Sequence, residues 1–464
     1  MVASLLGTAI VLDSCGVCLT GLANLRHRLL GRRLIALACG ILFGVFSVGR
    51  MDEMRRSCFT GIPLASITAF AGVLVQDSYL SSSGDTILKL DLRYVSSRYS
   101  GSSTDARGVA LLVVNNGGSY SLGQWVAARA RLSRRDARSR EGYFARVSAR
   151  NIEAGGFVGR FYQFRYRLKQ SLEYRIEDMG HPAAELFKAL FLGSREGLPT
   201  DLQDSFRRTG TLHVLAISGL HVGIIYLFVS VLLQPLPWRT LRLVVGTVLI
   251  VLYIFLVGLR PSLVRASLVL VLAGTGLLLD RDSAPLNLLA VALLVVVVVD
   301  PFSVYTLSFQ LSFLAVFGIL TIGRFVSSAL APFLPKALHL ALAYSLGAQV
   351  LTAPLLVYHN GTVHPIAIVA SALLVPVITL FLAGGMVMLL LSPARVAFLG
   401  DGSAWILGSL YRLLSFSTNL LARVPGVYLP VGSPAVGYVF GAGIVCVLFL
   451  PTVVARIRGG GYRV

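Results

Sequence analysis

The chain has 464 residues, of which 55% are hydrophobic and only 13% are charged, with a mean hydropathy of +0.77. In a soluble globular protein, roughly a quarter of all residues are charged. This composition therefore excludes an ordinary soluble protein and makes the lipid bilayer the main solvent. Lys and Arg number 41 against 21 Asp and Glu, a formal net charge of +20. Basic cytoplasmic loops of a membrane protein account for part of that excess.

Residues 1–56 contain two short apolar stretches around the basic turn "RHRLLGRR" (residues 26–33). They predict two transmembrane helices joined in the cytoplasm, with the N-terminus and the following segment outside. No basic n-region or clear cleavage site precedes the first stretch, so we expect a retained helix and not a signal peptide. Cys15 and Cys18 form a C-x-x-C without a second pair or a nearby histidine, so we expect no zinc site and no other cofactor.

Residues 57–156 form a segment of a different kind. Stretches such as "TILKLDLRYV" and "GVALLVVN" alternate apolar and polar residues with a period of two, and Ser/Gly-rich runs such as "SSSGD" separate them. About five strands without an intervening helix predict a small extracytoplasmic β-barrel of the OB kind. An SH3-like barrel would give nearly the same pattern and stays open as an alternative.

The barrel segment is basic, with twelve Lys or Arg against seven acidic residues between Ser66 and Ala154. Arginines interleaved with aromatic residues fit a polyanion whose bases also stack, such as single-stranded nucleic acid. A solvated charged face or a contact with lipid headgroups is an equally weighted alternative. The candidate DNA-binding residues are Arg129, Arg131, Arg134, Arg135, Arg138, Arg140, Trp125 and Tyr143.

Residues 157–209 predict amphipathic helices that are too polar to cross a membrane. The stretch "FYQFRYRLKQSLEYRIED" mixes aromatic residues with arginines, as interfacial helices do. Residues 210–464 then predict a bundle of nine spans. We place these spans near residues 211–235, 240–258, 262–279, 285–300, 304–323, 338–358, 364–391, 403–420 and 435–454.

The fold class that follows is a polytopic α-helical membrane protein of about eleven spans with an inserted, extracytoplasmic OB-like barrel. An odd number of crossings that starts outside leaves the C-terminus inside, where its arginines are expected. The span near 364–391 is long enough to break in the middle, so the count of spans depends on it.

Several predicted spans carry polar side chains, which lipid disfavours and which usually face a cavity or one another. The pair Ser218-Gly219 offers an unwinding point inside the first span of the bundle, with histidines on both sides. Simple hydrogen bonds between helices, or an arginine that extends to the membrane surface, are the alternatives. The candidate channel-lining or gating residues are His213, Ser218, Gly219, His221, Ser262, Arg265, Gln310 and Gln349.

Four stretches of the bundle, in this order, resemble the ComEC family of competence proteins: "HVLAISGLHVGII", "GLRPSLVRASLV", "LSFQLSFLAVFGI" and "AQVLTAPLL". The resemblance implies a channel in the cytoplasmic membrane that carries one DNA strand inward. It also implies a separate DNA receptor, nuclease and cytosolic translocase as partners, besides membrane lipid, and it leaves a homodimer open. The matching residues are His213, Ser218, Gly219, His221, Gly258, Ser262, Arg265, Ala266, Gln310, Ser312, Phe313, Gln349 and Pro354.

Two departures from the family pattern qualify the resemblance. Many members continue into a metallo-β-lactamase-like domain, whereas this chain ends at Val464 and its seven histidines form no His-x-His-x-Asp-His cluster. We therefore expect a channel and not an enzyme. A family asparagine is replaced by Ser371. A secondary transporter of a small anionic solute or ion remains the alternative function, and an intramembrane serine hydrolase that uses Ser218 is the weakest hypothesis because no G-x-S-x-G elbow is present.

Overall fold

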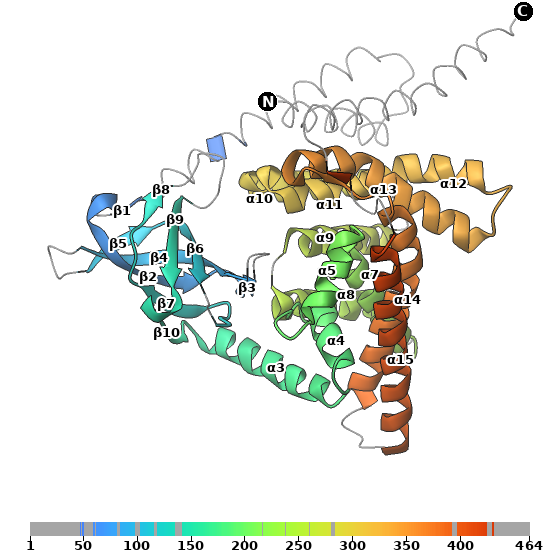
Figure 1. The fold of residues 1–464 in the computed structure, drawn as a ribbon, viewed down its shortest axis with the longest axis horizontal. Helices are drawn as coiled ribbons and strands as arrows, with labels where there is room; N and C mark the ends of the chain where they lie inside the picture. The colour runs from blue at the N-terminus through green and yellow to red at the C-terminus, as the bar shows by residue number, and fades with distance from the viewer. Residues whose placement is uncertain are drawn as a thin grey trace, which may run out of the picture. The chain divides into compact units, whose positions relative to one another are not determined.

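The computed structural model describes residues 47, 49–50, 59–60, 62–80, 84–97, 103–115, 118–134, 142–215, 217–236, 238–258, 260–279, 284–391, 397–424 and 429–430 (Figure 1). The two N-terminal spans and the span near 435–454 lie outside these residues. The chain divides into two compact units. The first comprises Met1–Asp178, Leu192–Gly197 and Ile225–Phe309, and the second comprises Met179–Phe191, Leu198–Ile224 and Gln310–Val464.

The first unit contains a mixed β-sheet. The five strands that the alternating pattern predicts are present as β2 (Ile67–Leu74), β4 (Thr86–Ser97), β6 (Val109–Asn115), β7 (Gln124–Ala128) and β9 (Tyr143–Ser148). The sheet also contains the strands β1 (Phe59–Thr60), β3 (Tyr79–Leu80), β5 (Ser103–Arg107), β8 (Ser133–Arg134) and β10 (Ile152–Phe157). The order is β10-β7-β2-β4-β6-β9-β8, with β3 and β5 also paired to β4 and β1 paired to β5. The β6–β9 pair is parallel, and the other pairs are antiparallel.

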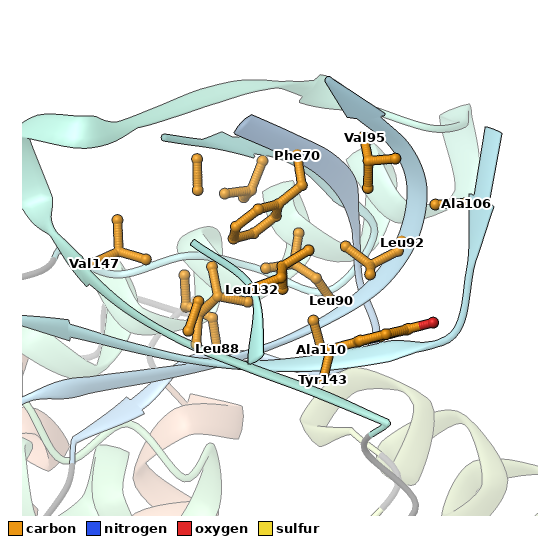
Figure 2. Close-up of a cluster of buried hydrophobic side chains, with 14 of the residues drawn as sticks. Phe70, Leu88, Leu90, Leu92, Val95, Ala106, Ala110, Leu132, Tyr143 and Val147 are labelled. Atoms are coloured by element: carbon orange, nitrogen blue, oxygen red, sulfur yellow. The ribbon is translucent and has the colours of Figure 1, made fainter. Parts of the chain in front are cut away.

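Alternate residues of these strands point into one hydrophobic core, as Figure 2 shows. In β4 every second side chain from Thr86 to Leu92 is buried, because successive side chains of a strand point to opposite faces. Phe70 of β2, Leu112 of β6 and Val126 of β7 bring the same inward faces together. Burial of these apolar side chains is the main free-energy gain of the domain.

The alternation of β4 breaks at Arg93. Ala71 of β2 pairs with Tyr94, and the next residue, Gly72, pairs with Leu92. Arg93 is therefore an extra residue in β4 that has no paired residue in β2. This is a β-bulge, which re-aims the side chains around it. Arg93 and Tyr94 are consequently both exposed, although they are consecutive residues of one strand.

Among its described residues the first unit also contains the helices α3 (Arg160–Glu177), α8 (Arg239–Val257), α9 (Pro261–Leu278) and α10 (Pro285–Val299), together with the second half of α7 (Gly219–Leu232). Pro261 and Pro285 occupy first helical positions, where the missing N–H of proline costs nothing. Helix α3 contacts α8, α8 contacts α9, and α9 contacts α10. A short 3-10 turn, η3 (Pro301–Tyr305), follows α10.

The second unit is almost entirely helical. Its elements are α4 (Ala183–Phe191), α5 (Thr200–Arg208), α6 (Leu212–Leu215), the start of α7 (Gly219–Leu232), most of α11 (Leu307–Gly318), the π-helical turn η4 (Ile319–Gly323), α12 (Arg324–Leu330), α13 (Lys336–Asn360), α14 (Ala367–Leu391) and α15 (Ala397–Ala422). A two-stranded sheet joins β11 (Thr362–Val363) to β12 (Leu429–Pro430). Helix α14 packs against α13 and α15, and α4 contacts both α14 and α15 (Figure 1).

Four stretches among the described residues are long and apolar enough to cross a membrane: α8, Leu307–Leu330, α13 and α14. Helices α7 and α10 and the stretch Ser262–Leu278 are apolar but shorter. The predicted span near 304–323 differs most, because its helix starts at Leu307 after the 3-10 turn and continues to Leu330. The stretch near 364–391 is one helix that contains Pro376. These helices fit a membrane protein, and the number of eleven spans stays a prediction.

Candidate functional site

The first predicted span of the bundle is interrupted at the Ser-Gly pair. Helix α6 ends at Leu215, and α7 starts at Gly219. The carbonyl of Ser218 accepts hydrogen bonds from the N–H groups of His221 (3.1 Å) and Val222 (3.4 Å). Ser218 is therefore the N-cap of α7, and the chain before it leaves the helical path.

The imidazole of His221 closes this cap from the other side. Its Nδ1 accepts a hydrogen bond of 3.1 Å from the N–H of Ser218 and lies 2.9 Å from the Ser218 Oγ. The third residue of the helix thus returns a side-chain acceptor to the N-cap N–H, which is the arrangement of a capping box. A ring nitrogen that accepts from a backbone N–H carries no proton, so the imidazole is neutral in this geometry. The His221 side chain is completely buried.

The turn in front of this motif is held by two further histidines. Nδ1 of His213 lies 3.2 Å from the carbonyl of Gly210, and Nδ1 of His364 lies 3.0 Å from the carbonyl of Arg208. Gly210 has a φ of 70°, and a Cβ there would overlap the side chain of His364. His364 was not predicted as a site residue, and no local pattern marks it, because its partner lies 156 positions away in the chain.

The two predicted glutamines lie on helices whose backbones touch. Gln310 is on α11 and Gln349 is on α13, and both are half-buried. On the same two helices, Gly318 and Gly347 are packed so tightly that a Cβ on either one would overlap the backbone of the other. Small residues at such a crossing let membrane helices approach closely. The π-helical turn η4 directly follows Gly318, and such turns recur at functional sites.

Ser262 and Arg265 both lie on α9, in the first unit. The Arg265 side chain is only 7% exposed, so protein atoms cover it and it does not extend to the surface. This burial argues against the snorkelling alternative. Convergence of these two residues with the other candidates stays a prediction, because the second unit contains His213, Ser218, Gly219, His221, Gln310 and Gln349.

A buried ion pair that the sequence did not predict lies inside the first unit. Arg165 of α3 donates from Nη1 and Nη2 to the Asp77 carboxylate at 2.8 and 2.7 Å, and its Nε donates to the carbonyl of Phe255 at 2.8 Å. Lys169 Nζ adds a third contact to Asp77 at 3.1 Å. The network ties the loop after β2 to α3 and to the C-terminal end of α8. The β-domain is thereby attached to a helix of the apolar part of the chain.

Charge explains the protonation state of this network. Burial alone would raise the pKa of Asp77, but the hydrogen bond from Arg165 and the positive charges of Lys169 and Arg165 outweigh it and lower the pKa to about 2. Asp77 is therefore ionised at neutral pH. Nearby in the same unit, burial and the positive charge of Arg260 lower the pKa of Arg195 to about 10. Two cations close together leave this region of unit 1 positive.

The predicted DNA-binding arginines divide into described and undescribed residues. Arg129, Arg131 and Arg134 are exposed on the β-domain, and Arg129 lies 3.6 Å from the carboxylate of Glu153. An ion pair this exposed contributes little to stability and is easily exchanged. The remaining three candidates, Arg135, Arg138 and Arg140, lie outside the described residues.

The two aromatic residues predicted to bind DNA differ in their burial. Trp125 is half-buried on the outer face of β7, where its ring stacks on Tyr94 with centroids 6.2 Å apart. The prediction that Tyr143 stacks on DNA is wrong, because its side chain is 5% exposed and lies in the core (Figure 2). Alternation decided this, since Tyr143 shares the inward parity of Ala145 and Val147.

A metal site would need several His, Cys, Asp or Glu side chains close together among the residues that the structure describes. Within those residues, no group of three or more His, Cys, Asp or Glu side chains is placed to hold a metal ion.

A model of a known protein family matches the helical part of the chain. The family model described as "Competence: Competence protein" matches residues 190–454, which is more than half of the chain. The matched region contains α5 to α15, with the break at Ser218 and Gly219 near its start. No solved structure matches the chain.

Three curated relatives share parts of it. An uncharacterized protein of Aquifex aeolicus is 34% identical over 202 residues, which cover 43% of this chain and 46% of the relative. ComE operon protein 3 of Bacillus subtilis is 28% identical over 203 residues, covering 44% of this chain and 26% of that protein. The uncharacterized protein YcaI of Escherichia coli is 28% identical over 144 residues, 29% of this chain and 19% of the relative. The alignments thus span less than half the length of each relative.

Proposed function

Because this chain belongs to the competence protein family, we propose that it forms a channel that carries single-stranded DNA across the cytoplasmic membrane during natural transformation. Membership supports a role in competence and DNA uptake. The channel, its substrate strand and the direction of transport are our own extension. The similarity to ComE operon protein 3 over 203 residues supports the same reading.

The observation that carries the proposal is the helix break at Ser218 and Gly219, inside the region that the family model matches. Non-helical backbone at membrane depth is tolerated only where it is buried in protein or lines a water-filled cavity. His221 stabilises the start of the second half-helix, and His213 lies on the first. We assign the gate of the channel to this break.

We propose channel-lining roles for the remaining polar candidates as well. Buried Arg265 supplies a guanidinium, whose fork suits a phosphate. Ser262 lies one turn away on the same helix, and Gln310 and Gln349 supply neutral hydrogen-bonding groups. A phosphodiester chain needs such groups wherever it is separated from water.

The β-domain supports DNA capture outside the membrane. The five strands that the sequence predicts follow the order β7-β2-β4-β6-β9 with one parallel pair, which supports an OB-like, partly open barrel. Exposed Arg129, Arg131 and Arg134 supply phosphate contacts, which carry no sequence information and make binding salt-dependent. The network of Arg165 and Asp77 would hold this domain on α3 and α8 while DNA is passed on.

The proposed topology is that of a multi-pass protein of the cytoplasmic membrane with about eleven spans. The N-terminus and the β-domain would lie outside, and the C-terminus would lie in the cytoplasm. A separate DNA receptor, nuclease and cytosolic translocase would complete the uptake machinery in contact with membrane lipid. A homodimer remains open, and no catalytic step is assigned to this chain.

The test is transformation frequency in a strain that lacks the gene, complemented with wild type or with variants. Wild type should restore transformation, and a chain with Arg131 and Arg134 both changed to Ala should restore less and bind single-stranded DNA with a smaller salt slope. Normal transformation in the deletion strain would overturn the proposal. A secondary transporter is the second candidate, favoured by the buried Arg265 as a site for a small anion. Solute uptake that follows a proton gradient would support that candidate.

A further inference from the structure

Two aromatic rings lie together on the outer face of the β-sheet. Tyr94 of β4 and Trp125 of β7 have ring centroids 6.2 Å apart and planes inclined by 16°. Strand β2 separates them, where Tyr94 pairs with Ala71 and Trp125 pairs with Val73. Tyr94 is 45% exposed, so its ring is available to a ligand.

The β-bulge at Arg93 places a cation next to this pair. Because of the bulge, Arg93 and Tyr94 both point outward, and the Arg93 side chain is 57% exposed beside Asp91 at 3.0 Å. Trp125 and Arg129 are four residues apart along one chain direction and therefore share the outer face. The Arg129 side chain is 77% exposed. Tyr94 thus has an exposed guanidinium next to it on β4, and a second exposed guanidinium, that of Arg129, directly follows the end of β7.

The strand beside Trp125 carries two glycines next to the indole. In β10 the register shifts between Ala154 and Phe157, which places Gly155 and Gly156 opposite this part of β7. A Cβ on Gly155 would lie 3.2 Å from the Trp125 Cβ, whereas a Cβ on Gly156 would meet nothing within 4 Å. Without side chains at these two positions, a flat group has room beside the indole.

We propose that Tyr94 and Trp125 form a stacking platform for the unpaired bases of single-stranded DNA, with Arg93 and Arg129 on the adjoining phosphates. The inference rests on the proposed function and adds to it the part of the nucleic acid that is recognised. Every base presents a π-face, so stacking selects single strands over duplexes without reading sequence. Arginine next to an aromatic ring contributes a cation–π attraction as well.

The test uses the full-length protein in detergent with two fluorescent probes, a thymidine oligonucleotide and an abasic sugar-phosphate strand of equal length. Wild type should bind the thymidine strand more tightly. Tyr94→Ala and Trp125→Ala should each weaken thymidine binding by roughly 5- to 150-fold, the range for one lost base–aromatic stack, and should leave binding of the abasic strand unchanged. Arg129→Ala should weaken both probes equally and reduce the salt slope.

Two further variants separate stacking from a structural role of the rings. Tyr94→Phe and Trp125→Phe keep an aromatic face and should retain the preference for bases. Tyr174→Ala removes another exposed ring, 71% exposed on α3, and should change neither probe. A variant that unfolds the sheet would lose abasic binding too, which distinguishes misfolding from lost stacking.

The outcomes also separate this inference from the function on which it rests. Failure of wild type to bind either probe would overturn the proposed DNA channel together with the platform. Equal binding of both probes, or unchanged thymidine binding in both alanine variants, would overturn the platform alone. Loss of binding to anionic lipid vesicles in the alanine variants, with DNA binding unaffected, would assign the same surface to lipid headgroups and likewise refute the platform.

Discussion

Arg165 and Asp77 form a buried bidentate ion pair, although 88 positions separate them in the sequence. Arg165 is completely covered, and the Asp77 side chain is 12% exposed. The same guanidinium donates to the carbonyl of Phe255. One side chain thus joins the β-domain, the amphipathic helix α3 and the end of α8.

Removal of the arginine should destabilise the first unit strongly. Arg165→Ala leaves Asp77 buried and removes its bidentate partner, with the ion pair to Lys169 kept, and loss of one partner of a buried pair costs about 3–5 kcal/mol. Thermal unfolding of the detergent-solubilised protein measures this loss. Arg207→Ala is the matched control, because its pair with Asp204 is exposed at 3.4 Å and should be worth at most about 1 kcal/mol. Equal effects of both variants would show that the buried pair has no special role.

The same network predicts how stability depends on pH. The folded pKa of Asp77 is lowered from 3.8 to about 2, so its contribution is fully present above 3.8 and is lost as the pH falls through about 2. The shift corresponds to about 2 kcal/mol. Asp77→Asn removes this titration, so the stability gap between wild type and the variant should shrink between pH 5 and pH 2. A gap that is constant over this range would contradict the assignment.

His221 should be replaceable by a residue that can also cap the helix. His221→Ala removes the acceptor for the Ser218 N–H, which costs about 0.5–2 kcal/mol at a helix start, and should abolish DNA uptake while membrane insertion is kept. His221→Gln offers an amide oxygen at the third helical position, as in ordinary capping boxes. We expect it to restore transformation in large part. A glutamine variant that inserts normally but transforms as poorly as alanine would show that the imidazole itself is required.

Ser218 lies 2.9 Å from a histidine nitrogen, which invites the serine hydrolase hypothesis. We expect no labelling of the protein by a fluorophosphonate, because the same Nδ1 already accepts the backbone N–H of Ser218. Labelling of wild type that disappears in Ser218→Ala would revive the enzymatic reading.

Arg265 should be required for uptake but not for insertion. Arg265→Ala removes the buried guanidinium of α9 and should lower transformation to the background of the deletion strain. Arg412→Ala on α15 is the control, because that side chain is exposed. The amount of each variant in the membrane fraction is measured alongside transformation. Wild-type transformation with Arg265→Ala would remove this residue from the proposed path.

The crossing of α11 and α13 depends on glycine. A Cβ on Gly347 would lie 2.7 Å from the carbonyl oxygen of Gly318 and from the N of Gly323, and this backbone has no flexible side chain that can move away. Gly347→Ala should therefore cost about 1–3 kcal/mol through overpacking. Gly408→Ala meets nothing within 4 Å and should be neutral or stabilising in its helix. Unfolding temperatures of the two variants provide the comparison.

Local sequence patterns predicted correctly those features that depend on a single strand or helix. The strands β2, β4, β6, β7 and β9 were predicted from period-two alternation, and the break at Ser218 and Gly219 was predicted from a Ser-Gly pair inside an apolar stretch. The same alternation predicts that Tyr143 is buried. Arg146 on the same strand must point outward, and Tyr143 has the opposite parity. Its burial could have been predicted from the spacing alone.

Composition and short periodicities are properties of the chain alone, so they predict a membrane protein, the strands, the helix break and the resemblance of its motifs to the competence family. The contacts of Arg165 with Asp77, Gly318 with Gly347 and Tyr94 with Trp125 arise from folding in three dimensions. Each of these pairs joins segments whose separation carries no periodic signal. A bulge added one residue to β4 and turned Tyr94 outward, and pairing of distant strands and helices decided which side chains meet.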